Sequence, residues 1–241
     1  MKHPQRRRIL DLEAIVTTAL VLVDETGDFS MPAIARKLGV SGPAMYHHVQ
    51  NRAELVDLIR ARLFEAHFED FRSLEWPEAV RAWTFAYRKI FSSHPNLVNI
   101  LVRYSIRDPR SLTAFDELAQ ILEEAGVPQH EVIVWITLFD SFTLSIALFS
   151  VAPGEIWDAT THASPTLQAA IDAGPRQPEL ANAAFEVGLA GLIERLKVSL
   201  KVSGRLAASA PVRSQEHEKA PTAVTMGANV AVPPEGIEPP T

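Results

Sequence analysis

The stretch GDFSMPAIARKLGVSGPAMYHHVQNRAEL, residues 27–55, decides the fold of this chain. Two short runs with apolar residues at helical spacing lie on either side of Gly39, and a serine precedes each run. Serine is a preferred helix cap, and glycine readily takes the left-handed backbone conformation that a tight turn needs. The pattern predicts helices over 31–38 and 42–48, joined as a helix-turn-helix.

Longer helices are predicted on both sides of this pair. The first covers 11–26, where the apolar residues form one helical stripe. The second covers 52–68, and Asn51 with Glu54 forms a capping box at its start. Four helices so close in sequence predict a self-contained domain over residues 11–68.

The helix-turn-helix resembles the DNA-binding domain of the TetR family of transcriptional repressors. The residues that carry the resemblance are Gly27, Phe29, Ile34, Ala35, Leu38, Gly39, Val40, Tyr46, His48, Val49, Asn51 and Leu55. The resemblance implies that the helix over 42–48 enters the major groove of a double-stranded DNA operator.

The resemblance implies two kinds of DNA contact, one to the phosphate backbone and one to the edges of the bases. By resemblance, Tyr46 reaches the phosphate backbone, and Arg52 takes the place of a phosphate-contacting lysine. Residues 42–44 and His47 would meet base edges, while amides at helix starts would add phosphate contacts. The complete set of expected DNA-binding residues is Ser30, Met31, Ser41, Gly42, Pro43, Ala44, Tyr46, His47 and Arg52.

Some residues depart from the family pattern. Pro32 stands where many relatives carry a base-reading arginine, and Gly42 and Ala44 offer no side-chain donors. Readout would then depend on apolar contacts and on a basic arm over residues 1–10, which is alternatively a solvated tail. These departures leave open a second interpretation: a small-molecule-binding helical protein with no role on DNA.

The rest of the chain reads as all-α, with a helical effector-binding and dimerisation domain over 69–202 and a disordered tail over 203–241. The tail contains six prolines and no aromatic residue. A loop over 153–178 is expected to hold one helical turn. Helices are expected at 78–93, 95–107, 112–125, 130–151 and 179–202.

The segments 76–94 and 185–192 resemble the effector domain of the tetracycline-repressor type. The resemblance implies a homodimer formed through the last two long helices, as symmetric operator half-sites require. The alternative is that these are core helices of a monomer. The expected interface residues are Phe142, Phe149, Phe185, Gly188, Leu189, Leu192 and Leu196.

Aromatic residues interleaved with a few polar ones predict an internal pocket for a small apolar effector, although the same spacing is typical of a plain core. The expected lining is Phe68, Trp83, Tyr87, Asn99, Arg103, Trp135, Phe139 and Asp140. Phe68 falls where the family's drug-binding histidine would be, and Val102 or Arg103 falls where its magnesium-binding histidine would be. Magnesium-tetracycline chemistry therefore does not carry over, and we expect no metal and no cofactor.

Composition narrows the class of protein. The 241 residues are 47% apolar, contain no cysteine and carry a formal charge of −6. Residues 1–65 hold nine Lys and Arg against eight Asp and Glu, so the acidity lies in the remainder. Residues 132–154 are long enough to span a bilayer, but Asp140 near their centre favours a buried helix. Without an enzyme motif, the sequence predicts a cytoplasmic, ligand-responsive repressor that is neither an enzyme nor membrane-bound.

Overall fold

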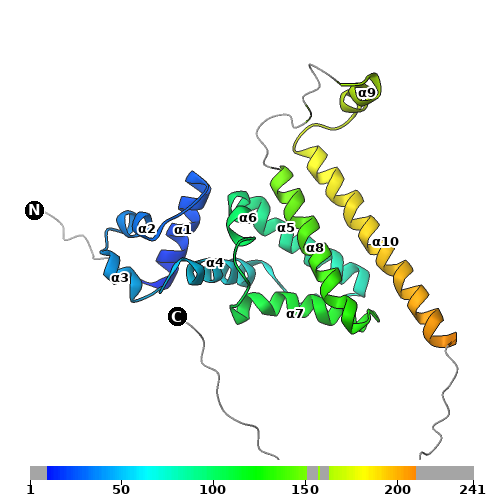
Figure 1. The fold of residues 1–241 in the computed structure, drawn as a ribbon, viewed down its shortest axis with the longest axis horizontal. Coiled ribbons are helices and arrows are strands. Elements are labelled where there is room, and N and C mark those ends of the chain that lie inside the picture. The colour runs from blue at the N-terminus through cyan, green and yellow to red at the C-terminus, as the bar shows by residue number, and fades with distance from the viewer. Residues whose placement is uncertain (1–9, 151–156, 158–162, 210–241) are drawn as a thin grey trace, which may run out of the picture.

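The structure is a computed structural model that describes residues 10–150, 157 and 163–209, and within these ranges it contains helices but no strand. Three helices form a head at one end, α4 leads away from it, and the remaining helices form a bundle flanked by α10 (Figure 1). This confirms the all-α prediction. The helices are α1 (Leu12–Thr26), α2 (Met31–Leu38), α3 (Gly42–Tyr46), α4 (Arg52–His67), α5 (Trp76–Ser93), α6 (Pro95–Leu101), α7 (Pro109–Glu124), α8 (Gln129–Ser150), α9 (Pro165–Ala173) and α10 (Glu179–Ser209).

The helices of the head begin after the predicted caps, and α1 and α2 end at the predicted glycines. The Asp11 side chain accepts a hydrogen bond from the Ala14 amide at 2.7 Å, which satisfies one of the unpaired donors of the first turn. Gly27 and Gly39 end α1 and α2 with φ of 81° and 70°, in the left-handed region. Asn51 caps α4 by accepting from the Glu54 amide at 3.0 Å. Local chemistry therefore fixes the boundaries of the head.

The head has its own small core. α2 packs against α1 and α3, and α1 packs against α4, so that their apolar residues meet at the centre. Ala35 lies in the tight space beside α3 and is 6% exposed. The fully buried side chains at this centre are Ile15, Val23, Ile34, Met45, Val49 and Leu55.

Aromatic rings fill the core of the bundle where α4, α5 and α7 meet. Trp83 stacks on Tyr87 with ring centroids 4.9 Å apart, and Phe64 lies edge-on to Tyr87 at 5.7 Å. The Trp83 indole N–H donates to the Ala114 carbonyl at 2.7 Å, so its polar atom is satisfied inside the core. This packing fixes the angle at which α4 enters the bundle.

Three helix ends differ from the sequence-based prediction. α3 ends at Tyr46, two residues early, and α6 ends at Leu101 rather than at 107. The chain restarts because Asp108 caps α7 by accepting from the Arg110 amide at 2.9 Å. α10 continues to Ser209, beyond the predicted end at 202, because its sequence contains no proline before Pro211. Residues 1–9 and 210–241, most of the predicted arm and tail, lie outside the described residues.

α8 is long and apolar enough to cross a membrane by length and composition. The same property is found in core helices of soluble proteins, and one such helix is weak evidence of a span. One face of α8 packs against α5, α7 and α10, and Trp135, Phe139 and Thr143 are buried on it. The opposite face carries exposed Ile133 and Val134.

Candidate DNA-binding and effector sites

The predicted recognition helix presents a largely exposed face. Tyr46 is 54% exposed, and Ser41, Pro43 and His47 are also exposed. The Ser41 hydroxyl accepts the Ala44 amide at 3.4 Å, and the Ser30 hydroxyl accepts the Ala33 amide at 3.3 Å. Gly42 and Ala44 are half-buried and complete the surface. The structure therefore brings the expected α3 residues together on one face of the head.

Met31 differs from the exposed residues of the expected DNA-binding set. Its side chain is only 8% exposed and packs in the head core. Met31 therefore contributes to the packing of the head, and its contact with DNA stays a prediction. His48, one of the residues that carry the family resemblance, is exposed.

Arg52 makes contacts that the sequence does not predict. Its guanidinium donates to Asp28 at 2.5 Å and to the Phe29 carbonyl, and it lies 4.1 Å above the centre of the Phe29 ring. It also donates to the Tyr104 hydroxyl at 3.2 Å. Partial burial would raise the pKa of Asp28, but the bonds from Arg52 and the Phe29 amide lower it overall. Arg52 thus connects the head to the bundle, and its guanidinium already donates hydrogen bonds within the chain.

Further polar contacts join the head to the bundle. The Asn96 amide donates to the Val23 carbonyl at 3.2 Å, and His94 contacts Asp24 at 3.0 Å. These contacts hold the end of α1 against the junction of α5 and α6. The head is therefore in contact with the bundle at α1 as well as through α4.

A buried polar cluster crosses the bundle. The Tyr87 hydroxyl donates to the Asp140 carboxylate at 2.5 Å. Burial and the Asp140 charge raise the pKa of Tyr87, and burial raises the pKa of Asp140 despite the opposing effects of Tyr87 and Arg60. Arg60, 3% exposed, donates to the carbonyls of Leu101 and Tyr104, both at 3.2 Å. The cluster links α4 to α5, α8 and the end of α6.

The structure does not gather the expected effector residues around one cavity. Trp83 and Phe139 are fully buried in the packed core, while Asn99 and Arg103 lie on the exposed side of α6 and the turn after it. Tyr87, Trp135 and Asp140 are likewise packed between helices. Of the predicted set, Phe68 lines a cavity between α4 and α7, and Arg103 lines one of equal volume beside the start of α4. Aromatic residues at helical spacing serve a core and a pocket equally well, so contact of the predicted set with an effector stays a prediction.

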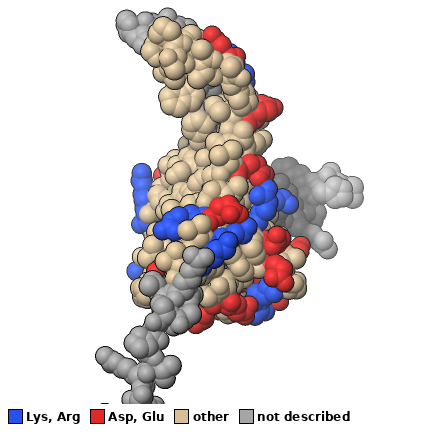
Figure 2. Space-filling model, turned by 90° about the vertical axis from the view of Figure 1, so that its right-hand side faces the viewer, with Lys and Arg blue, Asp and Glu red and all other residues tan. Residues whose placement is uncertain are grey.

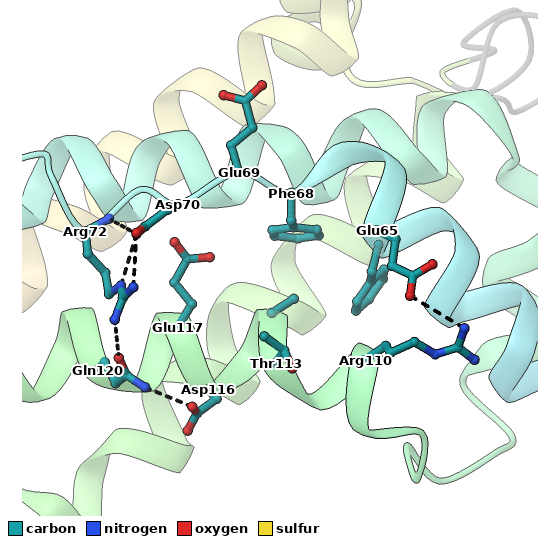
Figure 3. A pocket seen from close by; sticks show the side chains of 12 residues that line it. Glu65, Phe68, Glu69, Asp70, Arg72, Arg110, Thr113, Asp116, Glu117 and Gln120 are labelled. Atoms are coloured by element: carbon teal, nitrogen blue, oxygen red, sulfur yellow. Dashed lines mark hydrogen bonds and ion pairs between the residues drawn. The ribbon is translucent and has the colours of Figure 1, made fainter.

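The cavity lined by Phe68, about 420 Å³ in volume, lies between the end of α4 and the facing side of α7. Figure 3 shows the Phe68 ring, the Glu117 carboxylate and the Asp70–Arg72 ion pair around it. Sequence reasoning missed most of its lining, although acidic residues recur along both segments. The lining is Phe64, Glu65, Phe68, Glu69, Asp70, Arg72, Arg110, Thr113, Ala114, Asp116, Glu117 and Gln120.

Some of the expected interface residues are buried within the chain, and their contact with a second copy stays a prediction. Phe185, Leu189 and Leu196 are fully buried where α10 packs on α5 and α8 of the same chain. The Phe142 ring stacks on Phe185 at 5.6 Å, directly over Gly188, and Phe149 and Leu192 are half-buried. The prediction selected the most apolar stripe of each helix, and that stripe is used within the chain. The exposed apolar residues of the two helices are Ile133, Val134, Leu138, Leu148, Val187, Val198 and Val202.

Within the described residues, no group of three His, Asp or Glu side chains is arranged to hold a metal ion. His47 and His48 follow one another at the end of α3, and both are exposed.

Comparison with known proteins agrees with this architecture. The family profile "Tetracyclin repressor-like, C-terminal domain" matches residues 73–200, which is more than half of the chain. The tetracycline repressor protein class A from transposon 1721 of Escherichia coli is 29% identical, over 78% of this chain and 90% of that protein. The class E repressor of E. coli is 25% identical, over 76% and 89%.

A solved structure shares the fold. A possible TetR family transcriptional regulator from Streptomyces coelicolor superposes with a TM-score of 0.66, at 22% identity, over 78% of this chain and all of the other. The exposed helix-turn-helix, the long connecting α4 and the profile match lead to one assignment: the chain belongs to the TetR family of transcriptional regulators.

Proposed function

We propose that this protein is a homodimeric repressor that binds a double-stranded DNA operator and leaves it when a small molecule binds the bundle. The observation that carries the proposal is the exposed α3 face on a domain of the TetR family. The two tetracycline repressors to which the chain is similar are named for this activity. The proposal places the protein in the cytoplasm, where its DNA is, and gives it no enzymatic step.

The DNA contacts would come mainly from α3 and the helix starts. Tyr46 offers an exposed hydroxyl for a phosphate, and Ser30 and Ser41 stand at helix N-termini, where amides attract anions. Base readout would fall to His47 and to apolar contact of Pro43 with thymine methyl groups. Because few side-chain donors face outward, we expect the head to show only modest affinity for non-specific DNA.

Dimerisation would cover the apolar face that α8 and α10 leave exposed. Ile133 and Val134 are 64% and 61% exposed, and Val187 is 75% exposed. Figure 2 views the molecule from the side on which α10 lies in Figure 1 and shows an uncharged stretch above a belt of charged side chains. Apolar surface of this kind is typical of an obligate interface. A second copy would also supply the second head that a symmetric operator needs.

The direct test is a fluorescence-polarisation titration with labelled DNA from immediately upstream of the protein's own gene, against a scrambled duplex of equal length. We expect the upstream DNA to bind more tightly and its affinity to fall steeply with salt. Tyr46→Ala should weaken binding about tenfold, equivalent to about 1.4 kcal/mol. His130→Ala, at an exposed residue on α8, serves as the control.

Circular dichroism of both variants should show unchanged helix content, so that a loss of binding reports the surface and not unfolding. Equal affinity for both duplexes would reject the proposal. Ligand binding by a protein that binds neither duplex would instead identify a small-molecule-binding helical protein with no role on DNA.

A further inference from the structure

The cavity between α4 and α7 is unequally charged. Five carboxylates line it, those of Glu65, Glu69, Asp70, Asp116 and Glu117, against the two guanidinium groups of Arg72 and Arg110. A ligand entering this cavity meets an excess of negative charge, of which the Glu117 carboxylate is half-buried and the other four are exposed.

Both arginines are already engaged. Arg72 donates to Asp70 at 3.0 Å and to the Gln120 side chain at 3.1 Å. Arg110 contacts Glu65 at 3.5 Å and Asp108 at 2.8 Å. Neither guanidinium is therefore left to neutralise the remaining carboxylates.

Glu117 is the carboxylate that most needs a cation. Its side chain is half-buried and accepts the Phe71 amide at 2.6 Å, but no cation of the described chain lies within ion-pair distance of it. Burial and the nearby Asp70 charge raise the pKa of Glu117, against the opposing effects of the Phe71 amide and Arg72. An ionised carboxylate held in this way gains from a positive charge placed beside it.

An aromatic wall lies next to this carboxylate. The Phe68 ring is half-buried and lines the cavity, backed by Phe64 at a centroid distance of 5.2 Å and by Trp83 at 5.4 Å. Figure 3 shows the Glu117 carboxylate between the Arg72 side chain and this ring. A flat ring laid on Phe68 would gain stacking and apolar contact, and a cationic group on it would reach Glu117.

We propose that the effector of this protein is a flat aromatic molecule with one positive charge, its ring against Phe68 and its cationic group at Glu117. The inference rests on the proposed function, since it takes this cavity as the effector site. A neutral ring would bury Glu117 further without a partner, and an anionic ring would meet like charge. For one and the same ring, we therefore expect the cavity to bind the cationic form most tightly, the neutral form less tightly and the anionic form most weakly.

Three anthracene probes test the ranking because they share one fluorescent ring: 9-(aminomethyl)anthracene, which is cationic at pH 7, 9-(hydroxymethyl)anthracene, which is neutral, and 9-anthracenecarboxylate, which is anionic. Fluorescence anisotropy with the full chain gives each dissociation constant. We expect the cation to bind about tenfold more tightly than the neutral probe, as one partly buried charge pair provides, and the anion to bind most weakly.

Two variants on α7 locate the effect. Glu117→Gln keeps the size of the side chain and removes the charge, so the cation should lose its tenfold advantage while the neutral probe is unaffected. Glu123→Gln makes the same change on the exposed side of α7 and should leave all three affinities unchanged. Phe68→Ala should weaken all three probes together. Circular dichroism confirms that each variant is folded.

Equal binding of the three probes, preference for the neutral or anionic one, or an unchanged cation preference in Glu117→Gln would each overturn the inference. Absence of any binding would overturn it as well. Operator binding measured on the same preparation separates the two proposals: a protein that binds its operator but not the cation remains a repressor with another effector class. A protein that binds the cation without binding DNA retains the cation site and fails as a repressor.

Discussion

Gly188 of α10 lies directly beneath the ring of Phe142 on α8, so close that a Cβ at position 188 would stand 2.4 Å from Phe142 Cε2. The ring has little room to retreat because it stacks on Phe185 at 5.6 Å. Gly191, one helical turn away, would place its Cβ in open space. Gly188 and Gly191 thus have opposite roles, one required by a close approach and one not.

The first prediction compares these glycines. Gly188→Ala should lower the free energy of unfolding by about 1–3 kcal/mol, because the added methyl overpacks the contact. Gly191→Ala should be neutral or stabilise the protein by up to about 1 kcal/mol, because alanine favours the helix. Urea denaturation at a single protein concentration measures both. Equal stabilities for the two variants would contradict the close contact.

The second prediction concerns the buried hydroxyl of Tyr87. Tyr87→Phe removes the donor to Asp140 and should cost about 1–3 kcal/mol at pH 7. In the wild type, the hydrogen bond from Tyr87 lowers the pKa of Asp140. Without this bond, Asp140 of the folded variant is protonated at a higher pH than Asp140 of the folded wild type. The stability deficit should therefore shrink as pH falls through these pKa values.

Denaturation at several pH values checks the effect, with Tyr46→Phe, at an exposed tyrosine on α3, as the control. A deficit that stays constant between neutral and acidic pH would show that Asp140 is not the acceptor that matters.

The third prediction concerns Arg52. Arg52→Ala should lower the free energy of unfolding by about 1 kcal/mol. It removes an ion pair with Asp28, which is largely exposed, and a cation–π contact with the Phe29 ring. Arg62→Ala, on the same helix, breaks an exposed pair with Glu13 and should change stability by less. Thermal denaturation distinguishes them. Equal losses would mean that Arg52 does not hold the head to the bundle.

The fourth prediction tests the dimer. Val187→Glu combined with Val198→Glu places two charges on the exposed face of α10 and should convert the dimer to monomer in light scattering, with loss of operator affinity. Val102→Glu, at a residue 63% exposed beyond α6, is the matched control and should remain dimeric. A wild type that is monomeric at micromolar concentration would reject the proposed interface.

The head could be predicted almost residue by residue because its signals are local. Caps such as Asp11 and Asn51, and the left-handed glycine Gly39, act within one turn of the chain, so their positions in the sequence determine the helix ends. The exposed α3 surface followed for the same reason. Arg52 was the exception, because its partner Tyr104 lies 52 residues away.

The bundle was less predictable because its contacts are long-range. Sequence periodicity finds the apolar stripe of a helix, but not whether that stripe meets its own chain, a second copy or a ligand. Phe185 therefore appeared as an interface residue and is core. Trp83 appeared as a pocket residue and is also core, whereas Glu117 gave no signal until α4 and α7 were placed side by side.

The length of α4 determines how far its head end moves when the helix rotates about its cavity end. Its 16 residues span about 24 Å, with the cavity at one end and the start of the head contacts at the other. Rotating such a rod by about 5° about its cavity end moves the far end by about 2 Å. Under the proposed function, a ligand that opens the cavity by this small angle would shift each head by about 2 Å relative to its DNA groove.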